Sequence, residues 1–495
     1  MIMLGRTPCD DGVIRAGADA SACSARAKPW VLAATILGSS LAFIDGSVVN
    51  VALPSIQASL GASSPVTQWI INAYLLMLGA LILVGGAAGD RFGRRRVFVQ
   101  GIILFTAASV VCGFAPNASI LVAARAAQGI GGAMLVPGSL AIISAAFSQE
   151  ERGQAIGTWA GFSALTTALG PVLGGTLVDA WSWRAVFFIN VPLAIVTLAI
   201  TVVHVPESRA SASDAPIDWT GAVLATIGLA GIAFGASAAS EMRWGEPAVF
   251  APLSIGAAVL ILFIRHEGRA AAPMVPLRLF RSAVFSGTNA MTLLLYTALS
   301  GALFFLPFDL IRLQHYTAAA AGASFLPFSL IMGLLSRRSG ALMDRYGARL
   351  PLVLGPAIAA GGLALLALPA IGGSYWLTFF PPMVCLGIGM VIAVAPLTAT
   401  VMGAVDQRQA GTASGINNAV ARIANLLGVA LFGALAAGIS ASALDHASDA
   451  AFLRAFRGVM LAAAALALVS ALCAALTIPG VTPRAASAPR ARRPG

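Results

Sequence analysis

The sequence predicts an all-α integral membrane protein with about fourteen transmembrane helices. Of its 495 residues, 58% are hydrophobic and only 10% are charged, a composition too apolar for a water-exposed surface. A bilayer core requires about 20 apolar residues per helix, and such segments recur along the whole chain, separated by short loops. These observations exclude a soluble enzyme.

The apolar segments give the order of the predicted elements. Six spans come first, a pair follows, and six more spans complete the chain. The predicted spans lie near 30–53, 66–89, 96–115, 119–146, 153–178, 185–203, 217–238, 247–264, 284–308, 318–339, 349–370, 374–396, 411–438 and 456–478.

Positive charge is distributed unevenly over the predicted loops. The formal net charge is +11, and most of the 30 Lys and Arg residues fall in tails and loops on the side of the N-terminus. Cytoplasmic loops carry such an excess, so the sequence predicts that both termini are cytoplasmic. The basic composition is thereby explained by topology. The expected partner is the lipid bilayer, and no nucleic-acid partner is expected.

The two tails and the cysteines contribute no further site. Residues 1–29 are polar and contain no apolar core, which predicts a cytoplasmic tail rather than a cleaved signal peptide. Residues 479–495 are expected to form a disordered cytoplasmic tail, because Ala, Pro and Arg dominate its composition. The five cysteines lack metal-ligand spacing, so neither a disulfide framework nor a metal site is predicted.

A repeated loop motif relates the two six-helix blocks. The second span is followed by GAAGDRFGRRR, from Gly86 to Arg96, and the tenth by GALMDRYGARL, from Gly340 to Leu350. Transporters are commonly built from such repeats, with the substrate near the membrane midplane between them. We therefore expect an N-terminal block at 30–204, an inserted helix pair with linkers at 205–283, and a C-terminal block at 284–478.

Two charged residues within the spans indicate a proton-handling site. Asp45 lies in span 1, where a carboxylate is costly and where burial favours its neutral form, so it could bind and release a proton near neutral pH. Arg125 of span 4 shares a helical face with Gln128. Asp45 and Arg125 lie roughly 12 Å and 9 Å below the outer ends of their spans, which makes them candidate partners. The alternatives are a permanently paired structural carboxylate and an arginine that reaches the outer interface.

Polar residues in two later spans indicate a cavity or a helix contact. Span 13 carries Asn418, Arg422 and Asn425 at helical spacing, with Arg422 near mid-bilayer. Span 9 carries a milder stripe that includes Asn289 and Tyr296. Packing between helices would explain the neutral members equally well.

The charges within the spans also bear on the substrate. Asp309 lies at the outer mouth of span 9, where we expect it to be solvated. Asp45 is then the one clear carboxylate inside the spans, against the guanidinium groups of Arg125 and Arg422. This balance favours neutral or anionic lipophilic substrates over dications.

Taken together, these motifs resemble the major facilitator superfamily, and specifically its fourteen-spanner drug:proton antiporters of the EmrB/QacA type. The resemblance covers Trp30 to about Pro479 and includes WSWRAVFFINVP, from Trp181 to Pro192. It implies the major facilitator fold of two six-helix bundles, here with an inserted helix pair. It also implies export of lipophilic drugs or toxic small molecules across a bacterial inner membrane, driven by the proton gradient without a cofactor.

The resemblance assigns roles to residues of this sequence. It implies proton coupling by Asp45 and Arg125. It implies a cytoplasmic gate, closed in the outward-facing state, made of Gly86, Asp90, Arg91, Gly93, Arg94, Asp344 and Arg345. The antiporter signature corresponds to Gly170, Pro171, Gly174 and Gly175, although Thr166 stands where the family has glycine. The candidate cavity residues are Gln128, Asn289, Tyr296, Asn418, Arg422 and Asn425.

Three alternatives to this interpretation remain open. The repeated loop motif also fits topogenic charge with turn chemistry, because its glycines permit a tight loop and Asp90 can accept hydrogen bonds at a helix N-terminus. A proton-coupled symporter or a single-metabolite exporter would share the fold. A transport-dead sensor or scaffold is a further class. A periplasmic adaptor and an outer-membrane channel are candidate partners of an exporter.

Overall fold

The computed structural model describes residues 26–147, 149–209, 217–239, 242, 245–405, 410–440 and 448–479, and all regular structure in this part of the chain is helical. Two short segments depart from α-helix: η1 (Leu277–Arg281) is a 3₁₀ turn, and η2 (Asp309–Leu313) is π-helical. The helices are α2 (Lys28–Leu60), α3 (Ser64–Phe92), α4 (Arg94–Phe114), α5 (Ala118–Ala146), α6 (Gln149–Ala180), α7 (Ala185–Phe188), α8 (Asn190–His204), α9 (Trp219–Ala238), α10 (Pro247–Glu267), α11 (Ala283–Phe308), α12 (Ala318–Ala323), α13 (Leu326–Tyr346), α14 (Arg349–Leu365), α15 (Tyr375–Thr378), α16 (Phe380–Gly403), α17 (Ala410–Ser440) and α18 (Asp449–Thr477).

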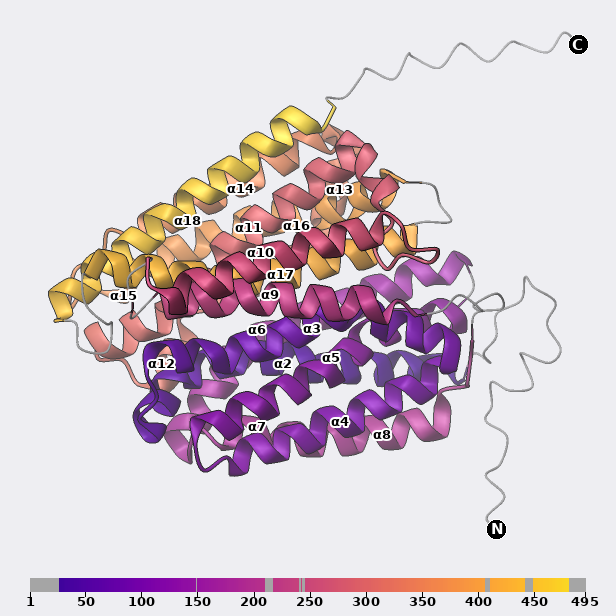
Figure 1. The fold of residues 1–495 in the computed structure, drawn as a ribbon, viewed down its shortest axis with the longest axis horizontal. Coiled ribbons are helices and arrows are strands. Elements are labelled where there is room, and N and C mark those ends of the chain that lie inside the picture. The colour runs from indigo at the N-terminus through magenta and orange to yellow at the C-terminus, as the bar shows by residue number, and fades with distance from the viewer. Residues whose placement is uncertain are drawn as a thin grey trace, which may run out of the picture.

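The helices form two bundles, with a hairpin of two further helices lying across the junction between them (Figure 1). In the N-terminal bundle, α5 packs against α3 and α4, and α2 packs against α6. In the C-terminal bundle, α11 packs against α17 and α18, and α14 packs against α16 and α18. The hairpin consists of α9 and α10, and α9 contacts one helix of each bundle, α3 and α17.

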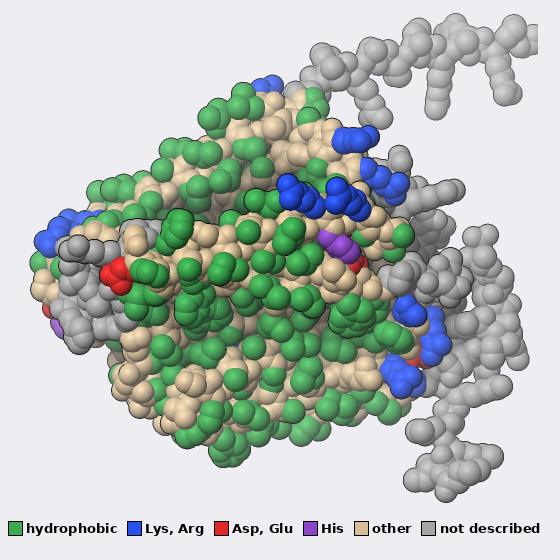
Figure 2. Space-filling model, viewed as in Figure 1, with side chains coloured by type: hydrophobic (Ala, Val, Ile, Leu, Met, Phe, Trp, Pro, Cys, Tyr) green, Lys and Arg blue, Asp and Glu red, His purple; other side chains and the backbone are tan. Residues whose placement is uncertain are grey.

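We name the two ends of the molecule after the predicted topology. The inner end holds the start of α2 and the end of α18, and the outer end holds α7, α12 and α15; the bundles diverge toward the inner end (Figure 1). Apolar side chains cover the middle of the molecule, whereas Lys and Arg side chains gather near its ends (Figure 2). This distribution matches a protein that crosses a bilayer.

Twelve helical segments of the described chain are long and apolar enough to cross a membrane. The predicted spans 153–178 and 349–370 are not among these twelve. They fall on α6 and α14, in which the described residues give the shorter apolar segments Leu169–Ala180 and Arg349–Leu365. The predicted count of fourteen is therefore not established by helix length and composition.

Small residues bring α3 and α5 close together and so place the charged residue of α5. A side-chain carbon on Gly129 would lie 2.4 Å from the carbonyl oxygen of Tyr74, and one on Gly85 would lie 2.1 Å from that of Ala133. Neither position can therefore carry a larger residue without moving the neighbouring backbone. This close contact leaves Arg125, one turn before Gly129, facing α3 and α2.

Candidate functional site

Asp45 of α2 and Arg125 of α5 form a buried ion pair at the centre of the N-terminal bundle. Asp45 is 0% exposed and Arg125 is 1% exposed. Oδ2 of Asp45 accepts a hydrogen bond from Nη1 of Arg125, and Nε of Arg125 donates to the carbonyl oxygen of Ile70 at 3.0 Å. The structure thus brings together the two residues expected to be partners.

Neutral side chains complete the hydrogen bonding of this pair. Gln128 donates through Nε2 to Oδ1 of Asp45 at 2.8 Å and accepts from Nη1 of Arg125 at 2.7 Å. Asn190 of α8 donates to the same Oδ1 at 3.3 Å. Ser109 of α4 accepts from both amides, at 2.7 Å from Gln128 and 3.2 Å from Asn190. A buried ion pair is tolerated only when its remaining polar atoms are satisfied in this way.

Tyr74 of α3 forms the boundary of the buried pair. The guanidinium carbon of Arg125 lies 4.3 Å from the centre of the Tyr74 ring, which is cation–π geometry. The Tyr74 hydroxyl donates to the carbonyl oxygen of Ala42 at 3.0 Å. Both Arg125 and Tyr74 also line the central cavity, so the cluster adjoins the space in which a ligand would lie.

The central cavity lies between the two bundles and has a volume of about 440 Å³. Helices α2, α3, α5 and α6 line it on one side, and α11, α13, α16 and α17 line it on the other. Four of the predicted cavity residues belong to its lining: Tyr296, Asn418, Arg422 and Asn425. Mostly apolar walls with a few polar groups are typical of sites for small lipophilic molecules.

Two predicted cavity residues do not line the cavity. Gln128 is fully buried in the Asp45 cluster. Asn289 is 3% exposed, donates to the carbonyl oxygen of Phe285 at 2.8 Å and accepts from Asn417 of α17 at 3.1 Å. Asn289 therefore joins α11 to α17. The polar stripe of α11 is thus divided, with Asn289 in this helix contact and Tyr296 in the cavity wall.

Arg422 is the cationic group of the C-terminal bundle in the cavity wall. Its guanidinium carbon lies 5.5 Å from the centre of the Phe43 ring on α2. Within the described chain, none of the ion pairs involves Arg422. The cavity thus presents a cation without a carboxylate partner among the described residues.

The expectation that Asp309 is solvated is wrong. Its side chain is 0% exposed at the junction of α11 and η2. Its place at the end of span 9 predicted exposure to water at the membrane surface. Instead, α12 and α18 pack against η2 and cover the Asp309 side chain. The spans therefore contain a second buried carboxyl besides Asp45.

The first copy of the repeated loop is bonded within its own bundle. Oδ1 of Asp90 accepts from Nε and Nη2 of Arg94 at 2.9 and 2.8 Å. Gly86 lies beside Pro137 of α5, and the guanidinium of Arg91 lies over the Phe92 ring. The matching residues of the second copy have side chains outside the described part of the structure: Asp344 and Arg345.

Glu207, whose place in the sequence is not distinctive, organises the same loop. Its two carboxylate oxygens accept from the backbone N–H groups of Arg95 and Arg96, both at 3.1 Å, at the start of α4. Gly93 has φ of +110°, and a side-chain carbon there would lie 2.7 Å from the Glu207 carboxylate. Glycine is therefore required where α3 turns into α4.

The predicted antiporter motif is the packing surface of α6. A side-chain carbon on Gly170 or Gly174 would lie within 3 Å of α2, against Ser47 and Val48 respectively. Gly175 faces the other bundle, where such a carbon would lie 2.2 Å from the carbonyl oxygen of Ala318. Pro171 lines the cavity, and its own carbonyl oxygen lies against Gly322 of α12.

Asp179 of α6 joins the outer ends of the two bundles. Its carboxylate accepts from the backbone N–H groups of Ala318 and Ala319 of α12, at 3.2 and 2.7 Å. We refer to this contact, together with the packing of Gly175 on Ala318 and Gly322 on Pro171, as the outer seam. The outer seam is closed in this structure, while the bundles diverge toward the inner end (Figure 1).

Four functional candidates were missed from the sequence. Asn190 was visible within the WSWRAVFFINVP stretch as an amide in an apolar span, whereas Ser109 had no distinguishing signal. Glu207 and Asp179 lie where helices end, where a carboxylate is ordinary, so only their partners reveal their roles.

Comparison with known proteins defines the class to which this fold and site belong. Residues 35–429 match the family described as the Major Facilitator Superfamily. The chain belongs to this superfamily of membrane transporters.

Its relatives include named resistance and export proteins. The multidrug resistance protein Stp of Mycobacterium tuberculosis is 34% identical over 423 residues, covering 85% of this chain and 78% of that protein. The tetracenomycin C resistance and export protein of Streptomyces glaucescens is 31% identical over 418 residues, covering 83% and 77%. A solved bacterial homologue of the human lysosomal transporter Spinster, in an inward-facing conformation, shares the fold with a TM-score of 0.62 at 18% identity, covering 92% and 97%.

Proposed function

We propose that this protein exports lipophilic drugs or toxic small molecules across the bacterial inner membrane in exchange for protons. The observation that carries the proposal is the buried Asp45–Arg125 pair at the wall of the central cavity. The names of the relatives, which include multidrug resistance and antibiotic export, support the same function.

The contacts of Asp45 suggest how a proton and a substrate would influence each other. Protonation of Asp45 removes the charge that holds Arg125, and Arg125 is itself part of the cavity wall. Arg125 then interacts with Tyr74 and with whatever occupies the cavity. Export follows if proton binding and substrate binding oppose each other across the conformational cycle. The gradient supplies the driving force, and no cofactor is part of the proposal.

The described conformation fits the substrate-receiving stage of such a cycle. The outer seam is closed by Asp179 and by glycine packing, and the cavity lies between bundles that diverge toward the inner end. In the outward-facing stage, we propose that Asp90, its arginines and the second copy of the repeated loop close the inner end.

We further propose the fourteen-spanner EmrB/QacA type, in which α6 and α14 also cross the membrane. The α9–α10 hairpin is then the inserted pair of residues 205–283, between blocks 30–204 and 284–478. Both termini are cytoplasmic in this arrangement. A periplasmic adaptor and an outer-membrane channel are candidate partners of the exporter.

Export of one specific metabolite is the second candidate function. It is favoured by the relative from Streptomyces glaucescens, whose name refers to the single compound tetracenomycin C. Testing a broad compound panel, rather than one drug, separates the two candidates.

The deciding experiment is drug susceptibility of an efflux-deficient host that expresses the protein, with and without an uncoupler. We expect raised tolerance to several lipophilic compounds and loss of dye efflux when the proton gradient is collapsed. The Asp45→Asn variant, expressed at the same level, is the matched control. Unchanged susceptibility across the panel, from a protein shown to be in the membrane, would contradict the proposal.

A further inference from the structure

Asp309 is a buried carboxyl that the proposed coupling site does not use. It begins the π-helical segment η2, directly after α11, and its side chain is 0% exposed. Neither of its carboxylate oxygens has a hydrogen-bond partner within the described chain. Single π-helical turns are rare and often mark functional positions.

The surroundings of Asp309 favour its neutral form in this conformation. A buried charge requires an ion pair and hydrogen bonds, and Asp309 has neither among the described residues. Gln314, whose amide also bonds with Ala370 and Gly372, and Arg457, which donates through Nη2 to the carbonyl oxygen of Pro369, both act on Asp309, but burial of the carboxyl outweighs them. A protonated carboxyl is therefore the form that this closed arrangement accommodates.

Asp309 is connected to the outer seam by a short, well-bonded segment. Only four residues separate η2 from α12, whose first N–H groups are accepted by Asp179 of the other bundle. Within this segment, Gln314 N–H donates to the carbonyl oxygen of Asp309 at 3.2 Å, and Tyr316 N–H donates to that of Leu310 at 2.9 Å. Movement of η2 would therefore displace α12.

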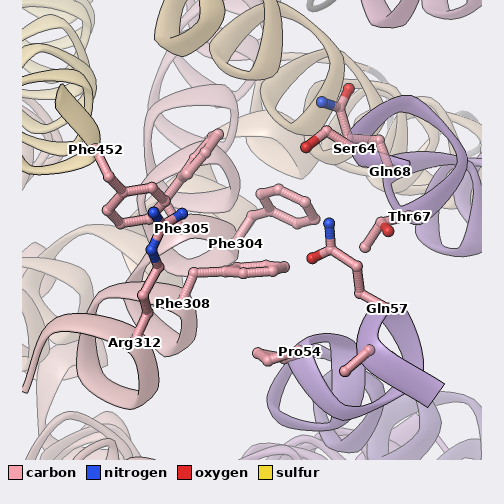
Figure 3. A pocket seen from close by; sticks show the side chains of 11 residues that line it. Pro54, Gln57, Ser64, Thr67, Gln68, Phe304, Phe305, Phe308, Arg312 and Phe452 are labelled. Atoms are coloured by element: carbon pink, nitrogen blue, oxygen red, sulfur yellow. The ribbon is translucent and has the colours of Figure 1, made fainter. Parts of the chain in front are cut away.

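A pocket of about 370 Å³ lies beside Asp309 at the outer end, between the bundles. Figure 3 shows Phe304, Phe305 and Phe308 of α11 facing Gln57 and Gln68 of the N-terminal bundle, with Arg312 of η2 beside Phe452. Residues before and after Asp309, namely Phe308 and Arg312, thus line a space on the outer side, while Asp309 itself is not part of the lining.

We propose that Asp309 is a second proton-binding site, loaded from the outer side, and that closure of the outer seam requires its protonated form. When the seam opens, water reaches Asp309 and stabilises the ionised carboxylate. Binding of a proton from outside removes that charge and allows α12 to return to Asp179. This inference rests on the proposed transport cycle but concerns the conformation of the outer seam alone.

Other ionisable groups pack around η2 and must be considered with Asp309. Helix α12 contributes none, and α18 contributes two arginines and the aspartate that pairs with Arg312 at 3.3 Å. The connecting loop contributes His315, which is exposed, and a tyrosine. Among the described residues of these segments, the ionisable groups are Arg312, His315, Tyr316, Asp449, Arg454 and Arg457.

The test measures the outer seam directly and needs no substrate. Spin labels are attached at Trp181→Cys and Leu368→Cys, whose native side chains are 79% and 71% exposed at the outer ends of opposite bundles. The background is full-length protein in lipid nanodiscs with its native cysteines replaced. We expect the distance between the labels to lengthen as the pH rises from mildly acidic to mildly alkaline. The Asp309→Asn variant, which resembles the protonated form, should keep the short distance throughout.

Two matched controls separate Asp309 from its neighbours. Asp449→Asn removes a carboxylate that is 60% exposed at the same end, and His315→Gln removes the nearby imidazole. Both variants should keep the pH response of the wild type. A wild-type distance that does not change with pH, or a full response in Asp309→Asn, would overturn the inference. Because the readout is a distance, a failure to detect drug efflux would count against the proposed function and leave this result standing.

Discussion

The guanidinium of Arg422 on α17 lies over the Phe43 ring on α2, with 5.5 Å between the guanidinium carbon and the ring centre. The contact crosses the central cavity from one bundle to the other. A ring face attracts a cation but does not neutralise it, so Arg422 remains available to an anionic ligand.

Neutral or anionic lipophilic compounds are therefore the expected substrates. We predict that Arg422→Ala reduces efflux of weak-acid uncouplers and hydrophobic carboxylates more than efflux of neutral compounds. The Arg422→Lys variant, which keeps the charge, should retain part of the activity toward anions. Minimum inhibitory concentrations for matched acid, neutral and dicationic compounds provide the measurement. Robust efflux of dications that survives Arg422→Ala would refute this assignment.

Asp45→Asn should abolish proton-coupled export while the protein still inserts and folds. The amide can keep hydrogen bonds with Gln128 and Asn190, but it cannot exchange a proton or balance the charge of Arg125. Breaking a buried ion pair typically costs about 3–5 kcal/mol, so thermal unfolding in detergent should be measured beside dye efflux. Full uncoupler-sensitive efflux by Asp45→Asn would move the coupling role to another residue.

Gly175→Ala should impair closure of the outer seam. The added carbon would lie 2.2 Å from a backbone oxygen of Ala318, which cannot move away as a flexible side chain could. Overpacking of this kind costs about 1–3 kcal/mol, here only in the closed conformation. Gly161→Ala on the same helix is the control, because a carbon there would meet no atom within 4 Å. Equal transport rates for the two variants would show that the seam does not limit the cycle.

Asp218, the N-cap of α9, predicts a pH dependence of stability. Burial alone would raise its pKa, but hydrogen bonds from Gly221 N–H and His266 bring the pKa below the ordinary value of 3.8. A lowered folded-state pKa means that the stabilisation is present above pH 3.8 and is lost as the pH falls below it.

We therefore expect Asp218→Asn to lower stability at neutral pH by about 0.3–1 kcal/mol. Asparagine can still cap the helix, so the difference isolates the charge. The difference from wild type should shrink as the pH falls below 3.8, which unfolding curves in detergent can follow. A difference that stays constant over this range would assign the effect to packing instead of charge.

Topology gives the last prediction. A cytoplasmic reporter fused after residue 495 should be active, and a reporter that functions only outside should be silent there. The reverse pattern would be expected for a fusion at the α9–α10 turn, near residue 245. An external C-terminus would rule out the arrangement of six, two and six spans.

The sequence predicted the charged pair well because an ionisable residue inside an apolar span requires a partner of opposite charge, and few such residues are present. Asp45 and Arg125 could be matched by depth alone, and the structure pairs them. Neutral members such as Ser109 could not be found, since serine is common in apolar helices. The error at Asp309 has a geometric cause. Distance from a span end predicts depth in the bilayer, but the burial of Asp309 also depends on α12, which follows η2 after a turn, and on α18, which is distant in sequence.

The position of α9 across the junction between the two bundles makes the two flanks of the molecule unequal. On the flank formed by α3 and α17, a third helix lies over the junction and Asn72 of α3 donates to Ser237 of α9 at 3.4 Å. The opposite flank is formed by contacts of α6 with α12 and α13. On the α3–α17 flank, α9 therefore lies between the surrounding lipid and the junction of the two bundles. For a compound that moves between the bilayer and the cavity, the α6–α13 flank is then the expected route, and bulky substitutions along it are expected to restrict compounds by size.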